Sequence, residues 1–80
     1  MVFNSLMIGV NLRQARKKCF PRDDMKAFAL RIGVSRATLQ KMEKGDLSVS
    51  LGKYYQAAKV LGLEHTFEQL FQQPVSLFDD

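Results

Sequence analysis

Gly33 constrains this chain more than any other residue, because short helical patterns lie on both sides of it. Before it, Phe28, Ala29 and Ile32 recur at helical spacing and predict one apolar face on a short helix. Gly33 itself suits the left-handed position that ends a helix, and Ser35 is a favourable N-cap for the next one. The pattern therefore predicts two short helices joined by a tight turn.

The second of these helices is expected to be amphipathic. Leu39 and Met42 are three residues apart and should point inward, and Gly45 should close the helix. The outward positions include no acid and no large hydrophobe: Arg36, Ala37, Gln40, Lys41 and Lys44. Guanidinium, methyl, amide and ammonium groups are the groups that contact base edges and phosphates in DNA. The two helices together therefore predict a helix-turn-helix that binds DNA.

Two stretches of the chain, RIGVSRATLQKMEKG and SVSLGKYYQAAKVLGL, resemble the Cro/repressor (Xre) family of bacterial and phage DNA-binding domains. The resemblance covers about residues 5–72. It implies an all-α fold, a compact five-helix lambda-repressor-like domain in which the second and third helices form the helix-turn-helix. We expect this domain to span residues 1–73 and a short C-terminal tail to span residues 74–80. The resemblance also implies a structural ion pair between Arg16, late in the first helix, and Glu43, near the end of the third.

The same resemblance assigns DNA contacts to the third helix and its surroundings. The base-reading positions are Arg36, Ala37, Gln40 and Lys41. Arg36 would donate two hydrogen bonds to a guanine, and Ala37 would pack on a thymine methyl. The candidate phosphate contacts are Ser35, Thr38, Lys26, Lys44, Ser48 and Lys53. For Ser35, helix capping explains the residue as well as DNA contact does. The family often has a glutamine where this chain has Met25, so one contact to phosphate and to the third helix is not expected here.

The first helix should be capped by Asn4 or Ser5 and ended by Pro21, and Asp23 or Asp24 should cap the second. The buried stripe of the first helix is expected to contain Ile8, Leu12, Ala15 and Cys19. Basic residues crowd its second half: Arg13, Arg16, Lys17 and Lys18. Apart from the arginine of the ion pair, these charges either complement the negative end of the helix dipole or contact phosphate.

The C-terminal half of the chain predicts two further helices. Ser50 should cap a fourth helix from Leu51 to about Leu61. The residues expected in the core here are Leu47, Val49, Leu51, Tyr54, Ala58, Leu61 and Leu63. Thr66 followed by Gln69 has the spacing of a capping box and predicts a short fifth helix.

Charge is distributed unevenly along the chain. All 12 Lys and Arg residues lie at or before Lys59, whereas half of the 8 acids lie at or after Glu64. A basic body with an acidic tail suits a domain that meets phosphate on one side and protein or solvent on the other. Ordinary solvated charge on a small soluble protein is the alternative explanation.

Apolar residues continue to the end of this acidic region. We expect them to contact a second subunit or a different protein: Phe67, Leu70, Phe71, Val75, Leu77 and Phe78. The alternative is that they fold back on their own domain.

These observations favour a homodimeric transcriptional repressor that binds a palindromic operator in double-stranded DNA. The alternative is an antitoxin-type protein that holds a partner, such as a toxin, through its tail and regulates its own operon. An enzyme is not expected, because Cys19 should be buried, His65 is solitary and no carboxylate pair has a useful spacing. No cofactor, metal or disulfide is expected with a single cysteine, and no apolar run approaches the roughly 20 residues of a membrane span. We therefore expect a cytoplasmic protein, and the resemblance implies a bacterial or phage origin and association with the nucleoid when bound.

Overall fold

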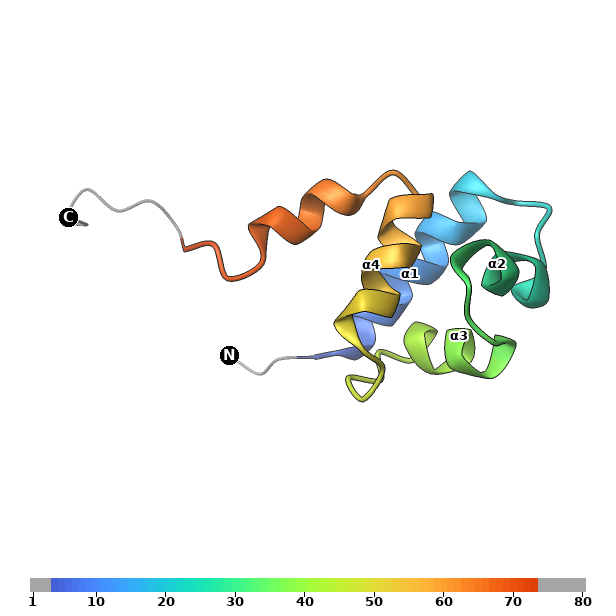
Figure 1. The fold of residues 1–80 in the computed structure, drawn as a ribbon, viewed down its shortest axis with the longest axis horizontal. Coiled ribbons are helices and arrows are strands. Elements are labelled where there is room, and N and C mark those ends of the chain that lie inside the picture. The colour runs from blue at the N-terminus through green and yellow to red at the C-terminus, as the bar shows by residue number, and fades with distance from the viewer. Residues whose placement is uncertain (1–3, 74–80) are drawn as a thin grey trace.

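The computed structural model describes residues 4–73, and every regular element in this range is helical (Figure 1). Four α-helices are followed by one 3-10 helix: α1 Leu6–Cys19, α2 Met25–Ile32, α3 Arg36–Glu43, α4 Leu51–Val60 and η1 Glu64–Gln69. The expected all-α, five-helix fold is confirmed. No helix of the described residues is long and apolar enough to cross a membrane.

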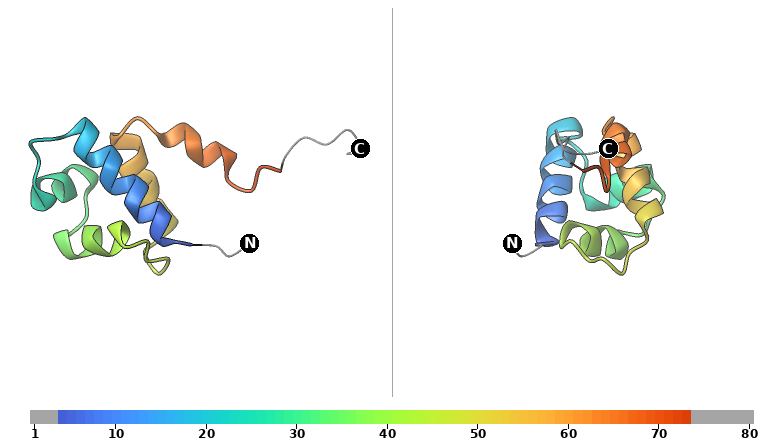
Figure 2. Two further views of the ribbon diagram at one scale, coloured as in Figure 1. Left: turned by 180° about the vertical axis from the view of Figure 1, so that it is seen from behind. Right: turned by 90° about the vertical axis from the view of Figure 1, so that its left-hand side faces the viewer.

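The core lies where the first four helices meet. The helix α3 packs against α1 and α2, α2 also packs against α4, and η1 packs against α4. Phe28, Leu39 and Met42 are the largest fully buried side chains, so the helix-turn-helix supplies the centre of the core. From the end of α4, η1 leads away from the bundle on the side opposite α2 (Figures 1 and 2).

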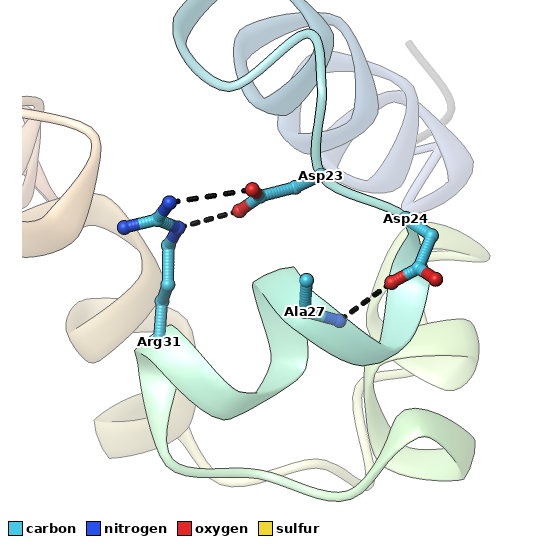
Figure 3. Close-up of polar contacts among 4 residues, drawn as sticks. All are labelled: Asp23, Asp24, Ala27 and Arg31. Atoms are coloured by element: carbon cyan, nitrogen blue, oxygen red, sulfur yellow. Dashed lines mark hydrogen bonds and ion pairs between the residues drawn. The ribbon is translucent and has the colours of Figure 1, made fainter.

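Short local signals fix the boundaries of α2 and α3 as the sequence predicts. The Asp24 side chain accepts a hydrogen bond from the Ala27 amide at 2.8 Å, which caps α2 (Figure 3). Gly33 ends α2 in the left-handed conformation, with a φ of 75°. Ser35 then caps α3 by accepting from the Thr38 amide at 3.0 Å. The turn between the two helices is therefore set by residues that lie within it.

Two glycines allow α1 to lie directly against the C-terminal end of α3. A Cβ atom on Gly9 would overlap the backbone carbonyl of Glu43 and would lie 2.7 Å from the Gly45 amide nitrogen. A Cβ atom on Gly45 would overlap the carbonyl of Ser5, and the φ of Gly45 is 75°. Because backbone rather than a movable side chain is the obstacle at both positions, only glycine fits this junction.

The buried stripe of α1 differs from the expected one. It consists of Gly9, Leu12 and Arg16, whereas Ile8 and Cys19 are exposed. The prediction for Ile8 and Cys19 was wrong because apolarity alone located the stripe. Gly9 and Arg16 face α3, so α1 is rotated by about one position from the apolar pattern.

Three leucines expected in the core near α4 are exposed instead. Leu47 and Leu51 are 62% and 61% exposed, and Leu63 is 38% exposed. Ala57, Ala58 and Leu61 bury the inner face of α4, while Val49 and Tyr54 are half-buried against the core. The prediction failed for these leucines because the chain after α4 leads away from the bundle and does not cover them.

The fifth helix forms, but the predicted capping box does not. Thr66 lies inside η1, and its hydroxyl donates to the Leu63 carbonyl at 2.7 Å. Phe67 is half-buried with its ring against that of Tyr55, whereas Leu70 and Phe71 follow the helix and are exposed. The other residues proposed for dimer or partner contact, namely Val75, Leu77 and Phe78, lie outside the described residues.

We expect Gly9→Ala to lower the free energy of unfolding by about 3 kcal/mol, the upper part of the usual cost of overpacking, because the obstructing atoms are backbone. Gly52→Ala is the matched control, since its Cβ would meet only the Ser50 hydroxyl at 3.9 Å. That change should be neutral or stabilising by up to about 1 kcal/mol. Urea unfolding of both variants measures the difference, and similar stabilities would contradict the close approach.

Candidate nucleic-acid interface

One face of α3 anchors the helix while the opposite face is open to solvent. Leu39 and Met42 are fully buried. All four residues predicted to read bases are exposed: Arg36, Ala37, Gln40 and Lys41. The structure therefore presents a guanidinium, a methyl, an amide and an ammonium group on a helix whose other side is fixed in the core.

The N-terminus of α3 carries Ser35 and Thr38, the two hydroxyl candidates for phosphate contact. The Ser35 hydroxyl accepts from the Thr38 amide and lies 3.0 Å from the Thr38 hydroxyl. The capping role of Ser35 is thus present in the structure. Because amide groups at a helix N-terminus also favour anions, capping and phosphate contact are compatible at this position.

The expected ion pair joins the other end of α3 to α1. Arg16 donates from Nε to Glu43 Oε2 at 2.6 Å and from a terminal nitrogen to Oε1 at 3.1 Å. The two side chains are only 7% and 9% exposed. A bidentate, buried pair of this kind is directional, so it fixes the position of α3 as well as holding it.

The lysines proposed for phosphate contact come from three elements. Lys26 lies in the first turn of α2, Lys44 directly after α3 and Lys53 in the first turn of α4, and all three are exposed. Long cationic side chains on the surface suit contact with a phosphate backbone.

Ser48, the remaining phosphate candidate, has a partner within its own loop. Its hydroxyl and amide both donate to Asp46 Oδ1, at 2.7 and 2.8 Å. These hydrogen bonds, followed by the nearby charge of Lys41, lower the pKa of Asp46. The Tyr54 hydroxyl donates to the Asp46 carbonyl at 2.7 Å, and burial raises the pKa of Tyr54. Since a carboxylate beside Ser48 disfavours a phosphate, Ser48 is a poorer candidate for phosphate contact than the exposed lysines.

A second cluster, which the sequence reasoning missed, fixes the loop before α2. Arg31 donates from Nε and a terminal nitrogen to the two carboxylate oxygens of Asp23, at 2.5 and 3.3 Å (Figure 3). The Arg31 guanidinium also lies 4.2 Å from the centre of the Phe20 ring, and Phe20 packs against Phe28. The hydrogen bonds from Arg31 lower the pKa of Asp23. This cluster holds the loop so that α2 begins at a fixed place.

A model of the helix-turn-helix family matches residues 24–67, from the N-cap of α2 to the middle of η1. This range is more than half of the chain. The protein belongs to the helix-turn-helix family. The Xre and lambda-repressor-like resemblance of the sequence is thereby confirmed, and this family is one of DNA-binding regulatory domains. No curated protein and no solved structure matches the chain.

Met25 marks the departure of this helix-turn-helix protein from the common family pattern. Its side chain is half-buried and packs against the core. Together with residues of α1 and α3 it lines a shallow hollow of about 400 Å³: Arg13, Arg16, Gln40, Glu43 and Lys44. Apolar packing thus occupies the place where a glutamine would form hydrogen bonds. Among the basic residues of α1, Arg13 is the exposed one that lines this hollow beside Gln40 and Lys44.

Replacing Glu43 by leucine should cost about 3 to 5 kcal/mol of unfolding free energy, because it leaves the Arg16 guanidinium buried without a partner. The double variant Arg16→Met with Glu43→Leu should recover most of this loss, since an apolar pair of similar size needs no charge partner. Urea unfolding of the wild type, both single variants and the double variant gives the coupling. Losses that simply add in the double variant would contradict a coupled pair.

The charge of Asp46 should stabilise the protein in a pH-dependent way. Because folding lowers the pKa of Asp46, the contribution is present above the ordinary pKa of an aspartate and is lost as the pH falls through the lowered value. We therefore expect Asp46→Asn to lower the melting temperature at pH 7, and the difference from wild type to shrink towards pH 2. A difference that stays constant over this range would exclude the effect of charge.

Proposed function

We propose that this protein is a sequence-specific transcriptional repressor that binds a palindromic operator as a homodimer, with α3 in the major groove of each half-site. The observation that carries the proposal is the exposed face of α3 within a matched helix-turn-helix. Arg36, Ala37 and Gln40 lie on the exposed face of this helix, and Leu39 and Met42 on its other face are buried in the core. Repression then requires only that the protein occupies its site.

The proposed roles follow from the chemistry of each side chain. Arg36 donates two hydrogen bonds to guanine, Ala37 packs on a thymine methyl, and Gln40 and Lys41 contact bases one turn later. The contacts proposed for phosphates are made by Ser35, Thr38, Lys26, Lys44 and Lys53. Charge supports this arrangement, because residues 1–73 contain 12 basic and 6 acidic side chains.

The antitoxin alternative uses the same DNA interface and differs only in what the C-terminal segment binds. Phe71, which is 99% exposed, is the observation that favours a bound protein of some kind at this segment. Sedimentation equilibrium of the protein alone separates a second copy from an unrelated partner.

We expect the protein to enrich a palindrome when bound duplexes are selected from a random DNA library at about 150 mM salt. The salt concentration is kept fixed because affinity for DNA depends steeply on it. Arg36→Ala should weaken binding to that palindrome by about 1 to 3 kcal/mol and relax the preference at one base pair. Lys53→Ala is the matched control for a phosphate contact and should weaken operator and random DNA alike. Equal losses on both DNAs for Arg36→Ala would overturn its role in reading bases.

A further inference from the structure

An open apolar groove lies on the part of the surface formed by α1, α4, η1 and the loop before α4. Its volume is about 440 Å³, and none of its lining belongs to the described residues of α2 or α3. Leu12, Ala58 and Leu61 form its buried floor. The exposed polar side chains along it are Asn11 and Thr66, and most of the exposed ones are also apolar: Ile8, Leu47, Leu51, Leu63 and Leu70.

This apolar groove gathers much of the exposed hydrophobic surface of the domain. Its leucines include all of those wrongly expected in the core, namely Leu47, Leu51 and Leu63. By contrast, Leu30 is 81% exposed on α2 and does not line the groove. A contiguous apolar patch of this kind is typical of an interaction site, whereas a single exposed leucine is ordinary.

We propose that the apolar groove binds the C-terminal segment, residues 71–80, of a second copy of this chain, and that the two copies exchange these segments reciprocally. The segment begins with Phe71, whose side chain is 99% exposed and whose φ is 64°. A bulky residue at positive φ is unfavourable, and Phe71 gains no burial in its own domain that would offset this cost. Contact with another chain would bury the Phe71 side chain and so offset the cost of its positive φ.

The length and composition of the chain beyond the described residues fit this occupant. Seven residues follow residue 73, and when extended they reach about 23 Å. They include Val75, Leu77 and Phe78, which are apolar like the groove. They end in Asp79 and Asp80, whose charge is opposite to the net +6 of residues 1–73.

The direction of the chain favours exchange between copies over folding back. Leu70 lines the groove of its own domain, and the next residue, Phe71, already lies fully in solvent. Figures 1 and 2 show residues 64–73 leading away from the bundle. A two-fold exchange uses the groove and the segment of each copy once, so every contact forms twice. It also leaves α3 uncovered on both copies.

Sedimentation equilibrium without DNA tests this interface. The inferred dimer rests on the proposed function only where it is given a role in binding an operator. The wild type should dimerise, and Leu51→Glu or Phe71→Glu should each raise the dissociation constant of the dimer by at least about 30-fold, because a carboxylate would be buried in an apolar site. Leu30→Glu is the matched control and should leave it unchanged. Both test positions are exposed. Leu51 is the first residue of α4, where the helix dipole stabilises the negative charge of a glutamate. Circular dichroism should therefore show an unchanged fold.

Mixing the two variants distinguishes exchange from other arrangements. A Leu51→Glu chain keeps its segment and a Phe71→Glu chain keeps its groove, so a mixture retains one intact contact. The mixture should form a one-to-one heterodimer more tightly than either variant forms a homodimer. No gain on mixing would overturn the exchange, and so would dimerisation of both variants at wild-type strength.

Deletion of residues 74–80 provides a second variant and should also weaken the dimer. A wild type that stays monomeric, or a groove that takes an unrelated protein in place of the segment, would overturn the inference even if sequence-specific DNA binding through Arg36 is retained. A dimer that Leu51→Glu disrupts but that enriches no DNA sequence would instead overturn the proposed function and leave this interface standing.

Discussion

The junction between α1 and the C-terminal end of α3 determines the position of α3, the helix with the exposed cationic face. Gly9 and Gly45 allow the two backbones to meet, and the Arg16–Glu43 pair fixes their relative position by two hydrogen bonds. Neither feature supplies much apolar burial. A buried ion pair is a weak source of net stability but is costly to break, so its main effect here is to exclude other placements of α3. The proposed reading of bases by the exposed residues of α3 depends on this fixed placement of the helix.

The helix-turn-helix could be predicted from sequence because its signals are local. Asp24, Gly33 and Ser35 act within four residues of their own positions, and Phe28 and Leu39 mark the inward faces of their helices. The ion pair is not local, since its residues are 27 positions apart. Only the family resemblance could indicate it, because no periodicity relates an arginine on one helix to a glutamate on another.

The rest of the fold depends on how the helices pack against each other. The periodicity of the sequence carries no information about that packing. The stripe of α1 was misplaced because the residues that face α3 include a glycine, which has no apolar side chain, and an arginine, a residue type that is rarely buried. The Arg31 cluster was missed because its partners lie in a loop of irregular structure. Leu47 and Leu51 have the sequence pattern of core residues, and only the path of η1 leaves them open to solvent.

This small domain has two different exposed surfaces. The face of α3 is polar and cationic, whereas the apolar groove is lined by α1, α4, η1 and the intervening loop. A domain of this size has little core to spare, and leaving several leucines in water costs about 25 cal/mol for each Å² that could be buried. Within the described residues of one copy, nothing covers these leucines. Two copies that cover each other's grooves would recover this cost and would at the same time hold two α3 helices in one particle, which is what recognition of a palindrome requires.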